Sequence, residues 1–149
     1  MSLKQEVYNS CYKILDDKIA AHQAALHDLT EGLGNDTKSS AGDKHETSRA
    51  MMQLEYEKIN NQLQEVKMQK ELLERMHSDA HSSTVIKGSL IKTNKGYLFL
   101  SVPLGRINIG NVSVMVLSPL SPLGVKLMGL KVNDSTSINN TSYVVEEIS

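Results

Sequence analysis

The stretch "MQLEYEKINNQLQEVKMQKELLERMH", residues 52–77, decides the fold because its apolar residues recur at alternating steps of four and three. The recurring positions are Met52, Tyr56, Ile59, Leu63, Val66, Lys70, Leu73 and His77, with one polar interruption at Lys70. Such steps place side chains on one stripe of a helix, and most other positions are Glu, Lys, Gln or Asn, as a solvated face requires. The stretch therefore predicts a long helix that buries one seam against another helix.

An earlier run with the same period supplies the partner helix. Its seam positions are Leu3, Val7, Cys11, Leu15, Ile19, His22, Leu26, Leu29 and Leu33. The segment between the runs, "EGLGNDTKSSAGD" at 31–43, is rich in Gly, Asn, Asp and Ser, which marks a turn. Two helices joined by a short connection pack antiparallel. We therefore expect a coiled-coil hairpin over residues 1–77, about 45 Å long, with its tip near residues 34–49.

After residue 77 the helical period ends and short β-branched runs begin. We expect a linker at 78–84 and an α+β domain at 85–149, formed by a small antiparallel sheet that one helix crosses. Strands are predicted in "TVIKGSLIKT", "YLFLSV", "INIGNVSVMVLS", "STSI" and "TSYVVEEI". The helix is predicted in "SPLGVKLMGLKV", with Ser121 as N-cap, Pro122 in the first turn and Gly129 as its stop.

Composition excludes several function classes. The net charge is −1, with 77 N-terminal residues at −3 and the remainder at +2, so no strong field for nucleic acid or membrane is expected. Cys11 is the single cysteine, which rules out an intramolecular disulfide and fits a reducing compartment. No apolar run reaches transmembrane length, and no signal-peptide core is present at the start. We expect a soluble cytoplasmic protein.

The predicted tip carries a pair of acids, Asp43 and Glu46. Their i,i+3 spacing puts both carboxylates on one side of a helix. Mg²⁺ prefers one or two protein carboxylates together with water and phosphate oxygens, so this pair suits a finger that completes another molecule's metal site. The alternative is helix capping, because acids are favoured at any helix N-terminus.

Two other groups of polar residues are weaker candidates. Lys38, Lys44 and Arg49 form a small basic cluster at the tip, suited to an RNA phosphate or simply to a solvated loop. His77 and His81, with Asp79 between them, have metal-ligand spacing if the segment is helical, although a polar helix end explains them as well.

Three features of the chain occur in a fixed order: "GDKHE" at the tip, the change near residue 80 that "VIKGSLIKT" opens, and "LSPLSPLGVKLMGLKVND". Together they resemble the Gre transcript-cleavage factors of bacterial RNA polymerase (GreA/GreB-like). "GDKHE" at the tip is similar to the family's Gly-Asp-Leu-x-Glu. The change near residue 80, opened by "VIKGSLIKT", is similar to the start of the family's FKBP-like domain. "LSPLSPLGVKLMGLKVND" is similar to the family's Ser-Pro-x-Ser-Pro, helix and Gly-Lys-x-x-Gly-Asp signature. The resemblance covers nearly the whole chain.

The resemblance implies a concrete function. Such factors bind bacterial RNA polymerase at its secondary channel and insert the coiled coil. The tip acids, here Asp43 and Glu46, help to hold the second catalytic Mg²⁺ and orient the attacking water. The polymerase then cuts the 3′ end of a backtracked RNA, so the factor is a monomeric accessory protein and not an enzyme by itself. The Mg²⁺ is shared with the polymerase rather than bound stably by the factor alone.

The resemblance also assigns residues for docking: Leu120, Ser121 and Pro122 lie where the family has its polymerase-docking segment, in an altered form. Lys44 and Arg49, from the basic cluster at the tip, are candidates for RNA contact.

The chain departs from the family pattern in two segments, at the hairpin tip and in the docking segment. After Glu46 the family continues Asn-x-Glu-Tyr, whereas this chain reads Thr47-Ser48-Arg49-Ala50. Leu120 stands where the family places an acid. These differences leave open a channel-binding inhibitor without cleavage activity. A different class, a coiled-coil scaffold or chaperone, remains the other alternative.

Overall fold

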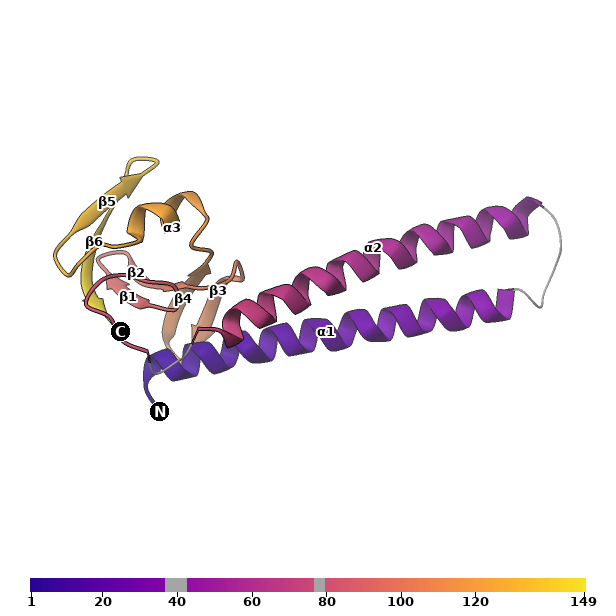
Figure 1. Cartoon of the computed structure of the whole chain (residues 1–149), viewed down its shortest axis with the longest axis horizontal. Helices are drawn as coiled ribbons and strands as arrows, with labels where there is room; N and C mark the ends of the chain where they lie inside the picture. Colours follow the sequence, from indigo (N-terminus) through magenta and orange to yellow (C-terminus); the bar gives the residue numbers. More distant parts are fainter. Residues whose placement is uncertain (37–42, 77–79) are drawn as a thin grey trace. The chain divides into compact units, whose positions relative to one another are not determined.

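The computed structural model describes residues 1–36, 43–76 and 80–149, and the side chains of 33–36 and 43–45 also lie outside its description. The helices and strands are α1 (Leu3–Asp36), α2 (Asp43–Glu74), β1 (Leu90–Thr93), β2 (Gly96–Leu100), β3 (Gly105–Ile109), β4 (Val112–Leu117), α3 (Pro122–Leu127), β5 (Ser135–Ile138) and β6 (Thr141–Ile148) (Figure 1). The chain forms two compact units. One unit comprises Lys13–Lys70, and the other comprises Met1–Tyr12 together with Glu71–Ser149.

The unit Lys13–Lys70 is an antiparallel helical hairpin, which confirms the fold predicted from the heptad seam. In the first half of α1, Oδ1 of Asp16 lies 2.8 Å from Nζ of Lys70, which is near the end of α2. Near the other end of α1, the backbone of Gly32 lies against the side chain of Met52. Both contacts require the helices to run in opposite directions, as they do in Figure 1. Within the described part of the chain, neither helix is both long and apolar enough to cross a membrane.

Helix α1 continues further than predicted. The sequence indicated a turn from residue 31, but α1 runs through Gly32 to Asp36. A Cβ at position 32 would come within 2.8 Å of Cε of Met52, so the glycine lets that side chain pack closely on the helix. Glycine inside a helix costs about 0.5–1 kcal/mol relative to alanine, and only the flexible end of Met52 would have to move to admit a Cβ at this position.

The second unit contains a six-stranded sheet in the order β3-β4-β2-β1-β6-β5. Each neighbouring pair is antiparallel except β2 and β4, which run parallel, with Leu98 opposite Met115. The predicted α+β fold with a mostly antiparallel sheet is therefore confirmed, and this pair is its one parallel exception among the described strands. The reason is that β3 pairs with the outer side of β4 as a hairpin, so β4 returns beside β2 in the same direction.

The first predicted strand is shorter than expected. Only Leu90–Thr93 forms β1, whereas Thr84 makes one isolated bridge with Lys131. Gly88 has φ +91°, in the left-handed region, and turns the chain so that Ser89 N–H bonds to the carbonyl of Ile86. A strand cannot pass through that turn unbroken.

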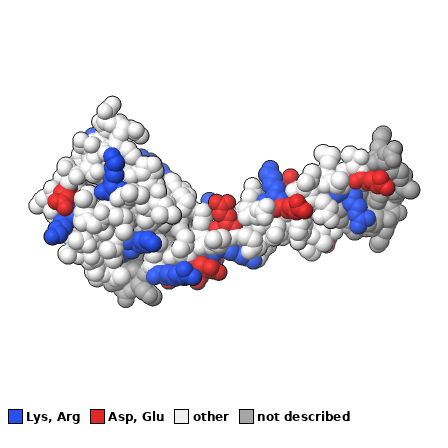
Figure 2. Space-filling model, turned by 45° about the horizontal axis from the view of Figure 1, so that its top comes forward, with Lys and Arg blue, Asp and Glu red and all other residues white. Residues whose placement is uncertain are grey.

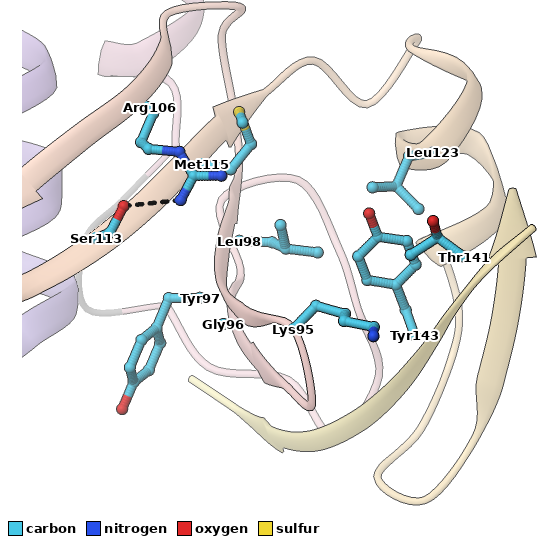
Figure 3. Close-up of a pocket in the computed structure, with 10 residues that line it drawn as sticks. All are labelled: Lys95, Gly96, Tyr97, Leu98, Arg106, Ser113, Met115, Leu123, Thr141 and Tyr143. Atoms are coloured by element: carbon cyan, nitrogen blue, oxygen red, sulfur yellow. Dashed lines mark hydrogen bonds between the residues drawn. The ribbon is translucent and has the colours of Figure 1, made fainter. Parts of the chain in front are cut away.

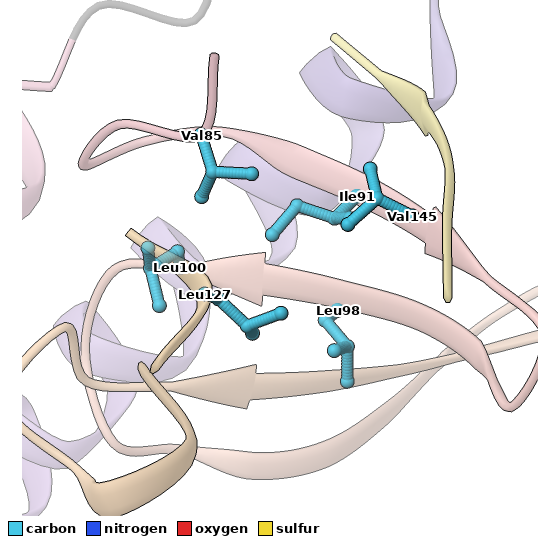
Figure 4. Packing of buried hydrophobic residues seen from close by; sticks show 6 residues of the cluster. All are labelled: Val85, Ile91, Leu98, Leu100, Leu127 and Val145. Atoms are coloured by element: carbon cyan, nitrogen blue, oxygen red, sulfur yellow. The ribbon is translucent and has the colours of Figure 1, made fainter. Parts of the chain in front are cut away.

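The hydrophobic core of this unit lies between the sheet and α3. Six buried residues form it: Val85, Ile91, Leu98, Leu100, Leu127 and Val145 (Figure 4). Helix α3 begins as predicted, because Oγ of Ser121 accepts a hydrogen bond from the N–H of Gly124 and Pro122 occupies the first turn. This sheet–helix layer forms the scaffold that holds the loop between β4 and α3.

The first turns of α1 and the last turn of α2 belong to this same unit. The buried Lys4 donates a hydrogen bond from its ammonium to the carbonyl of Ala80. The hydroxyl of Tyr8 donates to the carbonyl of Leu73 at 3.1 Å. These bonds tie the start of α1 to the segment that leaves α2.

Candidate functional site

The acid pair lies in the first turn of α2. The helix begins at Asp43, so Asp43 and Glu46 both fall within this turn, three residues apart. Glu46 is exposed, as are all residues from 46 to 50, including Arg49. The side chains of Asp43 and Lys44, and the whole of Lys38, lie outside the described part of the structure. Figure 2 shows acidic and basic side chains interspersed along the helices.

No complete metal site is formed by the described residues. Among them, no three or more His, Cys, Asp or Glu side chains lie close enough together to hold an ion. His77 and Asp79 of the alternative site lie outside the described residues, and His81 is exposed beyond the end of α2.

The loop at residues 118–121 joins β4 to α3 and exposes the side chain of Leu120. Leu120 is 85% exposed, more than any other large apolar residue described in this unit. Ser121 is half-buried and Pro122 is exposed. The three residues of the predicted docking segment therefore differ: Leu120 and Pro122 face solvent, while Ser121 holds the loop.

Hydrogen bonds fix the shape of this loop. The N–H of Leu120 donates to Oγ of Ser118 at 3.1 Å, and the hydroxyl of Ser121 donates to the carbonyl of Ser118 at 2.6 Å. The same hydroxyl oxygen accepts from the N–H of Gly124 at 3.1 Å. Leu120 is therefore exposed on a loop whose backbone is held on both sides. A loop whose backbone is already held loses little backbone entropy when a partner covers it.

Gly124 is a structural residue of this site that sequence reasoning missed. A Cβ there would lie 2.2 Å from the carbonyl oxygen of Ser118 and 2.9 Å from Oγ of Ser121. Any side chain at this position would push the first turn of α3 away from the loop. The available signal was a glycine three residues after the N-cap, in "SPLG", where a good helix former is the usual choice.

No protein-family model matches this chain, and no curated protein matches its sequence significantly.

Proposed function

We propose that this chain is a Gre-like transcription elongation factor, which binds bacterial RNA polymerase at its secondary channel and stimulates cleavage of backtracked RNA. In this proposal the hairpin carries Asp43 and Glu46 to the polymerase's catalytic centre. The loop that bears Leu120 attaches the second unit to the polymerase surface. The chemistry belongs to the polymerase, and the factor supplies ligands to the weakly held Mg²⁺.

The observation that supports this proposal most is the position of the acid pair at the start of α2. Helix α2 begins at Asp43, directly after the connection of the hairpin, and Glu46 is exposed in its first turn. A helix of 34 residues is about 50 Å long, so acids at the turn lie far from the opposite end of the hairpin. That is the geometry required of a finger that reaches into a narrow channel.

The electrostatics of a helix start fit this role. The N-terminal end of a helix carries partial positive charge, which favours acidic side chains in the first turn. Two carboxylates leave most of the coordination sphere of Mg²⁺ to water, phosphate oxygens and the partner's own acids. The pair would therefore bind the ion only in the assembled complex.

The exposed Leu120 supports docking through an apolar contact. In the family pattern an acid occupies this position, so a charge contact is replaced here by a leucine held on a rigid loop. An apolar anchor that enters a pocket of the partner gains affinity mainly through the area it buries. We expect Leu120→Ser to weaken polymerase binding and Pro122→Ala to weaken it less.

Transcript cleavage in a stalled, backtracked complex of the cognate polymerase tests the proposal. The wild type should accelerate cleavage, and Asp43→Asn and Glu46→Gln should each slow the stimulated reaction by about 10–100-fold. Glu55→Gln is the matched control, since Glu55 is an exposed acid further along α2, and it should keep full activity.

Two other results would redirect the proposal. If the wild type fails to stimulate cleavage but competes with an authentic cleavage factor, the protein is a channel-binding inhibitor. If it does neither, polymerase is not its partner.

A coiled-coil scaffold is a second candidate, favoured by one observation on α2. Met51 and Leu54 are each 66% exposed, and Met68 and Leu72 further along the helix are exposed as well. Exposed apolar side chains on a helix can pair with a second copy or hold a client. Sedimentation velocity decides between the candidates: a stable oligomer that Leu54→Gln dissociates supports the scaffold, and a monomer supports the polymerase factor.

A further inference from the structure

One face of the six-stranded sheet is only partly covered by α3. Residues opposite one another in neighbouring strands share a face of the sheet. Leu98 lies opposite Met115, and Met115 lies opposite Arg106, so these three side chains form a row across β2, β4 and β3. Leu98 belongs to the core under α3, whereas Arg106, two strands away, is exposed. The row therefore passes from the core out to solvent.

A pocket of about 360 Å³ lies where this row leaves the cover of α3. Its apolar wall is formed by Leu98, Met115 and Leu123, and Tyr143 from β6 closes one side (Figure 3). The ring of Tyr97 points away from the other side chains in this view. The volume lies in the range of pockets that bind small molecules.

The rim of the pocket is basic and rich in hydroxyl groups. Lys95, at the turn between β1 and β2, and Arg106 both line it, together with the hydroxyls of Ser113, Thr141 and Tyr143. The guanidinium of Arg106 donates to Oγ of Ser113 at 2.9 Å. Among the described residues that line the pocket there is no carboxylate, and neither cation forms an ion pair with any described acid.

A basic rim around an apolar wall selects ligands with two properties. The unpaired cations favour a negative group, because a charge-assisted hydrogen bond is stronger than a neutral one. The apolar wall favours an aromatic or aliphatic body. We propose that this pocket binds a small organic anion, with its apolar body against Leu98, Met115 and Leu123 and its carboxylate or phosphate at one of the two rim cations, Arg106 or Lys95, which Figure 3 draws on opposite sides of Leu98. This site is separate from the hairpin tip and does not depend on the function proposed above.

A matched series of naphthalene compounds tests the proposal by ¹H–¹⁵N NMR titration of the full chain. 1-Naphthyl phosphate and 1-naphthoate carry the two candidate head groups on the same body. 1-Naphthalenemethanol is the neutral control, and inorganic phosphate is the control without a body. We expect one or both anions to bind about tenfold more tightly than the alcohol, with backbone shifts centred on Leu98, Met115 and Tyr143. The stronger of the two anions identifies the head group.

Charge-neutral variants separate recognition of the anion from simple apolar binding. At least one of Arg106→Gln and Lys95→Gln should weaken binding of the preferred anion by about tenfold, and both should leave binding of the alcohol unaffected. Lys87→Gln and Lys131→Gln are matched controls, since both lysines are exposed in the same unit and do not line the pocket. The control variants should bind the anion as the wild type does.

Three results would overturn the proposal. Equal affinity for the alcohol and the anions would show that the rim selects no charge. Shifts centred outside the pocket would place binding elsewhere. Unchanged anion affinity in both Arg106→Gln and Lys95→Gln, with native spectra, would remove the two cations from the site.

Discussion

The hairpin and the sheet unit bury their apolar residues in different ways. In the hairpin unit the buried side chains form one narrow stripe, in which Leu15, Leu63 and Val66 are buried and the positions nearer the turn are only half-buried. In the sheet unit a continuous core is enclosed between the sheet and α3. Burial of apolar surface is the main stabilising term in folding. The contrast indicates one unit that encloses a core and holds a loop and a pocket, and another in which most of each helix surface is exposed.

The largest expected effect is in the core of the sheet unit. Leu100 is fully buried, so Leu100→Ala should lower the free energy of unfolding of this unit by about 2–5 kcal/mol, through lost apolar burial and the cavity left behind. Leu26→Ala in the hairpin removes a half-buried side chain and should cost less. Urea unfolding with hydrogen exchange read by NMR assigns each loss to its unit. An equal or larger loss for Leu26→Ala would contradict the contrast.

Gly124→Ala should have the next largest effect. Its Cβ would meet the carbonyl oxygen of Ser118, so α3 must shift, and we expect a loss of about 1–3 kcal/mol. Val125→Ala is the control, because Val125 is exposed in the same helix and its truncation should change stability little. Thermal unfolding measures both variants. If Gly124→Ala is as stable as the wild type, the loop is less constrained than its contacts indicate.

Ser121→Ala should have a moderate effect. It removes the N-cap of α3 and should cost about 1 kcal/mol. Ser121→Thr keeps a hydroxyl that can accept from the N–H of Gly124 and donate to the carbonyl of Ser118, so it should retain most of that stability. Denaturant unfolding compares the two variants. Equal losses in both would show that capping contributes little here.

The smallest effect on stability should come from the ion pair between the helices of the hairpin. Asp16 and Lys70 are partly exposed, so a double-mutant cycle with Asp16→Asn and Lys70→Gln should give a coupling energy of about 0.5 kcal/mol. Added salt should reduce it further, because solvent screens exposed charges. A coupling of several kcal/mol would mean that this pair, rather than the apolar seam, holds the hairpin together.

The seam also predicts a chemical property of the single cysteine. Burial raises the pKa of the Cys11 thiol to about 12, since a thiolate is disfavoured away from water. The thiol is therefore protonated at neutral pH, and iodoacetamide should label it very slowly in the native protein and readily in urea. Mass spectrometry measures the rate of labelling. Rapid labelling of the native protein would show that the helices open around Cys11. Because an unfolded thiol ionises near its ordinary pKa of 9.0, this group also lowers stability as the pH rises above that value.

The parts that could be predicted depend on local patterns. The heptad seam fixes a helix pair because its period is visible within one helix. Ser121 and Pro122 mark the start of α3 for the same reason, and Asn139-Asn140, both at positive φ, mark the turn between β5 and β6.

The parts that could not be predicted depend on contacts between distant segments. The parallel pairing of β2 with β4 is set by how β3 folds back, which no local pattern reports. The extension of α1 depends on Met52 packing against Gly32. The pocket depends on Lys95, Arg106 and Tyr143, which come from three separate parts of the chain. The acids at 43 and 46 were visible as residues, but the partner proposed for them is another molecule, which no pattern in this chain describes.

Tethered radical cleavage tests the central claim most directly. An iron chelate on Glu46→Cys, in a Cys11→Ala background, generates hydroxyl radicals at the start of α2 in the complex with backtracked polymerase. The account predicts cuts in the segments around the catalytic centre and near the RNA 3′ end, which Leu120→Ser should weaken. The same chelate on Lys58→Cys, further along the exposed face of α2, should cut elsewhere. Cuts confined to the outer surface of the polymerase, or none at all, would contradict the claim that this hairpin enters the channel.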